Sequence, residues 1–356
     1  MTIKTIMNVD KDELRLIADG GAVLGSGGGG SPYLGRLIAE QVLGEDKSVP
    51  VIAIEEMDDE ALVLPVAMMG APAVMLEKFP SGKELPDLVA TMERLLARKI
   101  SALLCIEAGG LNSTTPFIAA AQTGLPLIDG DGMGRAFPEL QMVSFTLGGM
   151  GATPMAMFDE KGNGVTFSTV SNSWTERLAR ALTIEMGGMA MVGLYPVTVG
   201  QCKDFLIKGS LSMARDIGQI MKDHGANASS AIADAFDGAL LFSGRIRDVE
   251  RFNEGGFTKG TVKIEGKGDF RNREAMLSFQ NEFLLAREGE NVLATTPDLI
   301  TLLDANTGES VPAEMVKYGL SINVLGLPCD PIWKTDEGLK MVGPDYFNLG
   351  VEYSPL

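Results

Sequence analysis

The sequence predicts an α/β N-terminal domain, in which a mostly parallel sheet has helices on both faces, followed by a β-rich α+β C-terminal domain. Helical and strand-like hydrophobic patterns alternate through the first part of the chain, which is typical of a sheet covered by helices. From Ala239 onward the patterns are mainly strand-like. The chain has 356 residues, of which 45% are hydrophobic, and this is enough for two cores. We place the domain boundary near residue 165, which gives domains of residues 1–165 and 166–356.

In the N-terminal domain each element is predicted from its hydrophobic period. Apolar residues at helical spacing predict helices at residues 12–18, 33–43, 85–99 and 115–123. Short apolar runs predict strands at residues 22–24, 49–54, 61–69, 100–106, 125–128 and 142–147. Two further apolar segments, 154–158 and 165–170, are joined by a polar, glycine-containing turn and predict a hairpin.

The C-terminal part begins with helical patterns and continues with strands. Helices are expected at residues 174–186, 203–222 and 229–236. Strands are expected at residues 240–249, 257–264, 275–286, 291–294, 299–303 and 321–325. We find no repeat of fixed period and no low-complexity tail.

Composition argues against several classes of function. The 47 acidic residues outnumber the 30 Lys and Arg residues, and the net charge of −17 repels nucleic acid and anionic lipid. There is no apolar run long enough to span a membrane and no secretory leader, so we expect a cytoplasmic protein. The three widely spaced cysteines are expected to be reduced.

The single histidine restricts the chemistry further. His224 lies at a polar helix end before a glycine, which is typical of a surface position, and histidine-based activation of a nucleophile would have to use it. Zinc sites built from several Cys and His residues are therefore not expected, and a metal ion would need Asp or Glu ligands. Cys329 lies between two prolines and is the thiol we expect to be most exposed.

The glycine-rich segment at residues 25–30 has five glycines in six positions. It is either a flexible linker or a loop whose backbone approaches a ligand closely. Element signals bracket it tightly, because Ser31 is a suitable helix N-cap and Pro32 fits the first helical turn, and this favours the ligand loop. The candidate binding residues here are Gly27, Gly28, Gly29, Gly30 and Ser31.

A dinucleotide site is an alternative interpretation of the same segment. Gly25, Gly27 and Gly30 match G-x-G-x-x-G, and Glu55 ends the next predicted strand, where such folds place an acidic residue on ribose. Against this, the following helix begins only after all the glycines. No Lys-Ser or Lys-Thr follows the loop, which excludes a P-loop.

Two other polar loops follow predicted parallel strands, and the carboxyl ends of such strands form ligand sites. Loop 107–114 contains an acid and an amide beside two glycines, and loop 129–135 contains two carboxylates and an arginine. Paired carboxylates can divide acid and base roles or bind a divalent metal ion, and arginine can clamp an anion. Asp and Gly are also ordinary turn residues. The candidates are Glu107, Gly109, Gly110, Asn112, Asp129, Asp131 and Arg135.

In the C-terminal part, polar residues interrupt two apolar strand patterns. Asn281 and Glu282 lie within one strand pattern, and Asp298 opens another after a proline. Such residues either face solvent, cap a turn or line a cleft. We include all three as candidate substrate-binding residues.

Six segments, in this order, resemble the S-methyl thiohydantoin desulfurase domain family, which is associated with hydantoinase and oxoprolinase homologues. The resemblance extends from about Asp10 to Tyr353. The segments are LGSGGGGSPYLG, EAGGLNS, GLPLIDGDGMGRAFPELQM, FSGRIRDVERFNEGGFTKG, FQNEFLLARE and TTPDLITLLDANTGE.

The resemblance implies an α/β domain followed by a β-rich domain, and removal of a methylthio group from a cyclic ureide or a related hydantoin hydrolysis. We expect amides of the glycine-rich loop and Asn112 to hold the ring carbonyls, and Asp129 or Asp131 to activate water directly or through a divalent metal ion. Arg135 or the loop amides would stabilise the charge that develops on the ring. The alternatives are a nucleotide- or dinucleotide-binding protein and a non-catalytic subunit of a hydantoinase-like complex. Expected partners are a small-molecule substrate and either a second copy of the chain or a hydantoinase-like subunit.

Overall fold

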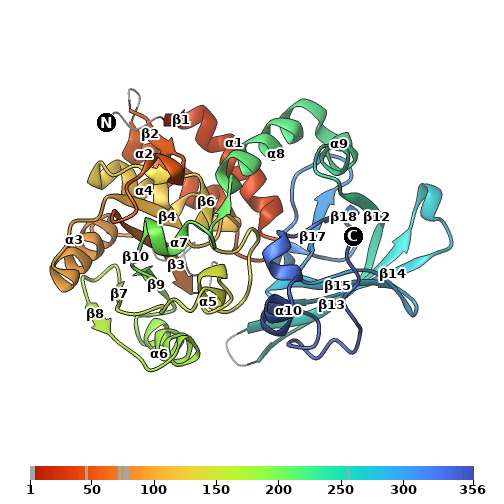
Figure 1. Cartoon of the computed structure of the whole chain (residues 1–356). Helices are drawn as coiled ribbons and strands as arrows, with labels where there is room; N and C mark the ends of the chain where they lie inside the picture. The colour runs from red at the N-terminus through yellow and green to blue at the C-terminus, as the bar shows by residue number, and fades with distance from the viewer. Residues whose placement is uncertain (1–4, 45–46, 71–73, 75–79, 255–256) are drawn as a thin grey trace.

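The computed structural model describes residues 5–44, 47–70, 74, 80–254 and 257–356. Figure 1 shows a sheet with its helices on the left and a second sheet on the right, with α8 and α9 lying along the top between them. The two-domain α/β and β-rich architecture expected from the sequence is confirmed.

The first sheet has nine strands in the order β1-β2-β5-β4-β3-β9-β7-β8, with β10 also paired to β3. Its centre is parallel, because β2, β5, β4 and β3 run in one direction, and the strands added at both sides are antiparallel. Strands β9 and β10 lie beyond residue 165 in the chain, so this sheet uses residues from both sides of that position. The strands are β1 (Thr5–Val9), β2 (Val49–Ile52), β3 (Leu62–Gly70), β4 (Ala102–Cys105), β5 (Leu127–Ile128), β7 (Met155–Phe158), β8 (Gly164–Phe167), β9 (Met189–Gly193) and β10 (Val197–Thr198).

Helices cover this sheet and connect it to the second one. They are α1 (Lys11–Leu24), α2 (Pro32–Leu43), α3 (Glu84–Leu96), α4 (Thr115–Thr123), α5 (Ser144–Leu147), α6 (Asn172–Glu185), α7 (Val199–Cys202), α8 (Ser210–His224) and α9 (Ala228–Ala235). Short 3-10 helices include η1 (Ile54–Glu56), η3 (Gly110–Ser113) and η4 (Gly225–Asn227). A small ribbon pairs β6 (Gly130–Asp131) with β11 (Ile207–Lys208).

The second sheet is antiparallel throughout, with seven strands in the order β16-β15-β14-β13-β12-β18-β17. Its strands are β12 (Ala239–Glu254), β13 (Phe257–Gly266), β14 (Glu274–Gln280), β15 (Glu282–Glu288), β16 (Asn291–Thr295), β17 (Leu299–Asp304) and β18 (Ser321–Leu327). The remaining elements are η5 (Gly268–Phe270), η6 (Ala313–Met315), η7 (Pro331–Lys334) and α10 (Asp336–Val342).

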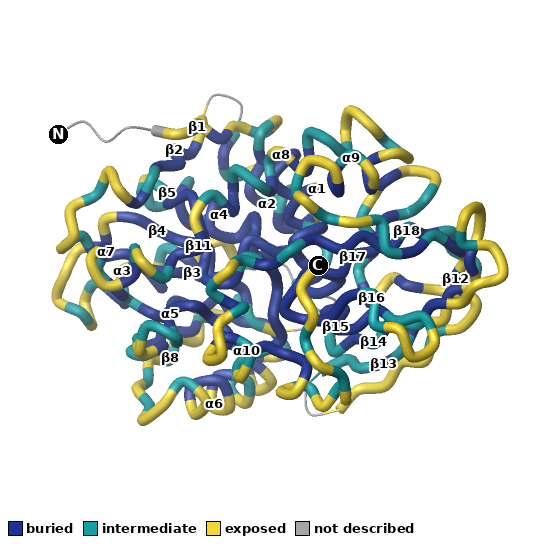
Figure 2. The backbone as a smooth tube through the Cα atoms, turned by 45° about the vertical axis from the view of Figure 1, so that its right-hand side comes forward, coloured by how far each residue is buried: buried dark blue, intermediate teal, exposed yellow. Residues whose placement is uncertain are grey.

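Each sheet has its own hydrophobic core, and the first core extends beneath α8, α9 and one face of β17 and β18. The most deeply buried backbone accordingly runs through the middle of the molecule in Figure 2. Among the described residues, no helix is long and apolar enough to cross a membrane.

The predicted strand at residues 22–24 is wrong, because these residues form the last turn of α1. Asp10 caps this helix by accepting hydrogen bonds from the amides of Asp12 and Glu13. Glycines in this part of α1 weaken the apolar pattern from which a helix is predicted. They are there because α1 packs closely on α8: a Cβ atom at Gly20 would lie only 1.8 Å from the carbonyl oxygen of Ala214. The glycines are required for close helix packing, and the glycine-rich loop therefore follows a helix.

Four other expectations need correction. Residues 142–147 contain the short helix α5 instead of a strand, and so short an apolar run has no resolvable period. The predicted strand 275–286 is a hairpin of β14 and β15, in which Asn281 takes the left-handed turn conformation with φ +59°. Helix α8 begins at Ser210, later than predicted. Cys329, expected to be exposed, is buried, and all three cysteines are free thiols.

Candidate functional site

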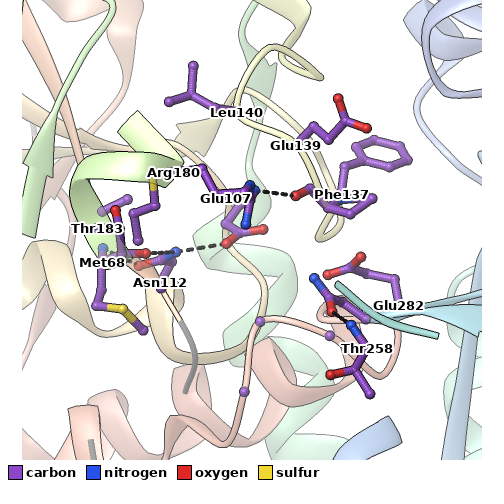
Figure 3. Close-up of a pocket in the computed structure, with 18 of the residues that line it drawn as sticks. Met68, Glu107, Asn112, Phe137, Glu139, Leu140, Arg180, Thr183, Thr258 and Glu282 are labelled. Carbon is purple, nitrogen blue, oxygen red and sulfur yellow. Dashed lines mark hydrogen bonds between the residues drawn. The ribbon is translucent and has the colours of Figure 1, made fainter. Parts of the chain in front are cut away.

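A cavity of about 500 Å³ lies between the two domains. Its floor is the glycine-rich loop, and its walls come from the ends of β3 and β4, the loop after β6, helix α6 and the β12–β15 side of the second sheet. The volume falls within the range of about 300–1,000 Å³ that is usual for small-molecule sites. Figure 3 shows side chains from both domains around this space.

The glycine-rich loop is held in place by both domains. The carbonyl oxygens of Ser26 and Gly27 accept hydrogen bonds from Phe283 and Ala313 of the C-terminal domain, at 2.7 and 2.8 Å. The carbonyl oxygen of Gly29 accepts one from Leu111 at 2.9 Å. This segment is therefore an ordered loop and not a flexible linker.

Some N–H groups of this loop, in contrast to the carbonyl groups described above, are without hydrogen-bond partners among the described residues. The N–H groups of Gly27, Gly29 and Gly30 donate to no partner within the described residues, and all three residues line the cavity. Successive free amides in a turn form a site for a carbonyl oxygen or an anion. A dinucleotide site would need a strand before the loop, whereas α1 precedes it here.

Glycine is required where the loop meets the C-terminal domain. A Cβ atom at Gly28 would lie 2.0 Å from Glu282 Oε1, and one at Gly27 would lie 2.4 Å from the ring of Phe283. Ser31 caps α2 by accepting a hydrogen bond from the amide of Tyr33, as predicted for a helix start. Gly109 and Gly110 lie behind the loop and pack against its backbone.

Glu107 follows β4 and extends into the cavity. Asn112 fixes it by donating to Glu107 Oε1 at 2.7 Å, while the Asn112 side chain also pairs with the backbone of Met68. Glu107 Oε2 is buried and has no hydrogen-bond partner among the described residues. Burial raises the pKa of Glu107 to about 8; the hydrogen bond from Asn112 lowers it, and the charge of Asp131 raises it further.

Glu282 enters the same cavity from the opposite domain, at the start of β15 (Figure 3). It is 3% exposed, and its Oε2 has no hydrogen-bond partner within the described chain. Burial raises the pKa of Glu282 to about 8, the charge of Glu107 raises it further, and Arg135 lowers it. Two carboxyl groups with unused oxygens thus face one space.

Asn281 also lines the cavity, where its Oδ1 accepts a hydrogen bond from the amide of Thr258 at 2.9 Å. Asp298 lies outside the cavity. Its carboxylate is fully buried and accepts hydrogen bonds from the amides of Cys329 and Leu356 and from the hydroxyl of Tyr353. This aspartate anchors the last segment of the chain to the second sheet.

Arg135, predicted to clamp an anion, is fully buried behind the cavity. Its guanidinium group donates to the backbone carbonyls of Ala136, Asp298 and Phe283, and more weakly to that of Pro297. Burial lowers its pKa to about 10. With its hydrogens used on carbonyls of both domains, Arg135 joins the domains together.

Asp129 and Asp131 also lie outside the cavity. Asp129 accepts hydrogen bonds from the amides of Leu211 and Ser212 and from the Ser212 hydroxyl, at the start of α8. Asp131 accepts them from the amides of Ala108 and Gly134, and burial raises its pKa to about 7. These N–H groups occupy the carboxylate oxygens, so the pair does not fit the predicted metal site. In the described part of the chain, no cluster of three or more His, Cys, Asp or Glu could hold a metal ion.

Comparison with known proteins gives the family. The N-terminal domain of the S-Me-THD-like family matches residues 12–169, and its C-terminal domain matches residues 170–356. The chain belongs to the S-Me-THD-like family. A crystal structure of a protein from Chromobacterium violaceum has the same fold, with a TM-score of 0.81 and 24% identity over 98% of this chain and 99% of the other. No curated protein matches the chain.

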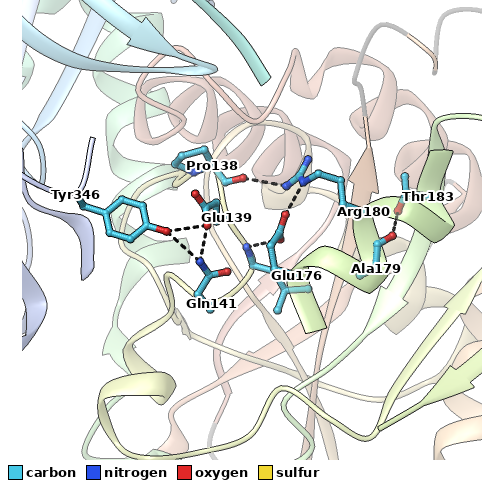
Figure 4. Close-up of polar contacts among 9 residues, drawn as sticks. Pro138, Glu139, Gln141, Glu176, Ala179, Arg180, Thr183 and Tyr346 are labelled. Atoms are coloured by element: carbon cyan, nitrogen blue, oxygen red, sulfur yellow. Dashed lines mark hydrogen bonds and ion pairs between the residues drawn. The ribbon is translucent and has the colours of Figure 1, made fainter. Parts of the chain in front are cut away.

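Sequence reasoning missed several charged residues that line the cavity of this S-Me-THD-like chain. Figure 4 shows that Arg180 pairs with Glu176, one turn earlier in α6, and donates to the carbonyl of Pro138. Glu139 accepts a hydrogen bond from Tyr346 at 2.9 Å. Arg251 lines the second wall and donates to the carbonyl of Ala313. The i,i+4 spacing of Glu176 and Arg180 was visible in the sequence, but it is typical of any exposed helix.

Proposed function

We propose that the chain is a hydrolase for a hydantoin-like cyclic ureide, similar to an S-methyl thiohydantoin desulfurase, and that Glu107 and Glu282 form its acid–base pair. The observation that supports this is the meeting of two buried carboxyl groups in one cavity, each with an oxygen that has no hydrogen-bond partner among the described residues. Burial of this kind is costly unless a ligand uses the free oxygens. The family membership agrees with this assignment.

The groups in the cavity match the edge of a cyclic ureide, which presents N–H donors beside carbonyl acceptors. A carboxylate accepts from a ring N–H, a neutral carboxyl donates to a ring atom, and the amides of Gly29 and Gly30 donate to a carbonyl oxygen. Because both pKa values are raised to about 8, a neutral acid and a carboxylate can coexist in the site near neutral pH.

The reaction we propose is hydrolytic. One carboxylate takes a proton from water as the water oxygen bonds to the ring carbon that bears the methylthio group, and the electron pair of the C=N bond moves to the ring nitrogen. The other acid gives its proton to sulfur as the carbon–sulfur bond breaks. The proton of the added hydroxyl group passes to the ring nitrogen as the new C=O bond forms. The products are the ring carbonyl compound and methanethiol. Charge that develops on the ring is stabilised by the loop amides.

The test is turnover of an S-methylthiohydantoin by the full chain, followed as release of methanethiol and of the hydantoin. Glu107→Gln and Glu282→Gln should each lower kcat by about 10²–10⁴, which is the usual contribution of a general acid or base. Glu290→Gln changes an exposed carboxylate in the turn after β15 and should leave kcat unchanged. Absence of turnover in the unaltered chain, or undiminished turnover in both cavity variants, would overturn the proposal.

A further inference from the structure

The two walls of the cavity differ in chemistry. The C-terminal domain contributes mainly polar side chains, including Arg251, Asn253, Thr258, Asn281 and Glu282. The side of the first sheet contributes a set of apolar side chains that are each no more than 9% exposed. This set, the apolar wall, consists of Met68, Met133, Phe137, Leu140, Val192 and Leu194.

The polar groups next to the apolar wall are already used within the protein. Asn112 spends its amide on Met68 and Glu107. Glu176 accepts from Arg180 and from the amide of Leu140, and the hydroxyl of Thr183 donates to the carbonyl of Ala179 (Figure 4). A ligand group on this side therefore meets an apolar surface with few free hydrogen-bonding groups.

The apolar wall is also supported from behind. The ring of Phe137 lies edge-on to Trp333, with 5.3 Å between centroids, and the guanidinium carbon of Arg135 lies 4.9 Å from the centre of the Phe137 ring. Trp333 is fully buried and donates to the carbonyl of Met133 at 2.8 Å. Side chains that are fixed in this way form a wall before any ligand binds, which reduces the entropic cost of binding.

The cavity is much larger than a bare ureide ring, since sites of about 500 Å³ enclose drug-sized ligands. On the basis of the proposed function, we infer that the ring carries a bulky apolar substituent, of the size of a benzyl or isobutyl group, and that the apolar wall selects it. The polar edge of the ring then faces Glu107, Glu282 and the loop amides. Burying each methylene against the wall should improve affinity about fourfold.

The inference is tested by calorimetric binding of a series of hydantoins that differ only at the substituent: methyl, isobutyl, benzyl and carboxymethyl. The benzyl compound should bind at least about tenfold more tightly than the methyl compound, and the carboxymethyl compound should bind more weakly than either. Val192→Phe fills the cavity from β9 and should remove the preference for benzyl while affinity for the methyl compound is retained. Leu194→Ala should weaken binding of benzyl more than of methyl.

Val165→Phe serves as the control, because Val165 lies on β8 outside the cavity, and thermal unfolding checks that each variant folds. Equal affinity for all substituents, or a preference for carboxymethyl, overturns this inference and leaves the proposed function in place. If none of the rings binds, the proposed function fails and this inference fails with it.

Discussion

Buried carboxylates occur in two kinds of surroundings in this molecule. Asp129 and Asp298 each accept hydrogen bonds from three donors, and neither lines the cavity. Glu107 and Glu282 are buried to a similar degree, yet each keeps an oxygen with no partner in the described chain. Asp129 and Asp298, with all these hydrogen bonds, hold structural elements together. Glu107 and Glu282 each have an oxygen that is available to a ligand.

This contrast shows that burial alone does not identify a functional acid. Hydrogen bonds to a carboxylate favour its charged form, whereas burial favours its neutral form. Burial raises the pKa of Glu107 and Glu282 to about 8, and it raises the pKa of Asp131 to about 7 even though amide hydrogen bonds lower it. The oxygen without a partner, and not the pKa, therefore distinguishes the two cavity acids.

The largest effect is expected for the double variant Glu107→Gln/Glu282→Gln, measured as the pH dependence of unfolding. Between pH 4.5 and about pH 8 the native chain retains protons on these acids that the unfolded chain has released. The free energy of unfolding therefore falls as pH rises through this window. The double variant should lose less stability than the unaltered chain between these pH values, in denaturant titrations at each pH. If the free energy of unfolding changed with pH equally in the two proteins, the pKa values of Glu107 and Glu282 would not be raised in the folded chain.

Asp298→Ala is expected to have the next largest effect, on stability rather than on binding. Removing this carboxylate leaves the amides of Cys329 and Leu356 and the hydroxyl of Tyr353 without their acceptor. Each unsatisfied buried donor costs about 1–3 kcal/mol, so we expect a loss of roughly 3 kcal/mol or more in the free energy of unfolding. A loss below about 1 kcal/mol in urea denaturation would show that Asp298 is not the anchor described above.

The sequence predicted features that depend on neighbouring residues and missed those that depend on distant ones. The start of α2 was predicted correctly because Ser31 and Pro32 act on adjacent backbone groups. Glu107 was proposed as a site residue because it follows a buried strand, and the structure places it in the cavity. Asn281 was assigned to a strand, since nothing nearby shows that this asparagine turns the chain.

Arg135 and Asp129 show why the remainder could not be predicted. An arginine and an aspartate in the polar loop 129–135 are expected to bind ligands, and the sequence does not reveal what else they contact. Arg135 is occupied by carbonyls of Phe283 and Asp298, far along the chain. Asp129 is occupied by the first turn of α8. Only the fold brings these partners together, so the sequence could not distinguish acids whose oxygens are hydrogen-bonded within the protein from acids with a free oxygen.

A smaller effect is expected for Gly28→Ala, which tests how closely the loop approaches the cavity acid. The added methyl group would lie 2.0 Å from Glu282 Oε1, so the side chain or the loop must move. Overpacking of this kind costs about 1–3 kcal/mol, and ligand affinity measured by calorimetry should fall because Glu282 is displaced. Gly151→Ala is the matched control, since its Cβ atom would make only an ordinary contact at 3.6 Å. Equal stability and equal ligand affinity of the two variants would show that the Glu282 side chain can move aside at no cost.

The smallest effect is expected for Asp129→Asn, and it separates the two kinds of carboxylate most directly. Asparagine keeps an acceptor for the amides of Leu211 and Ser212, so it remains a good cap for α8, and only the favourable charge at the helix start is lost. We expect the free energy of unfolding to fall by about 0.3–1 kcal/mol, with ligand affinity and turnover unchanged. Loss of turnover with an intact fold would instead return Asp129 to the catalytic candidates. A carboxylate that lies outside the cavity and is fully hydrogen-bonded to α8 is not expected to affect the reaction.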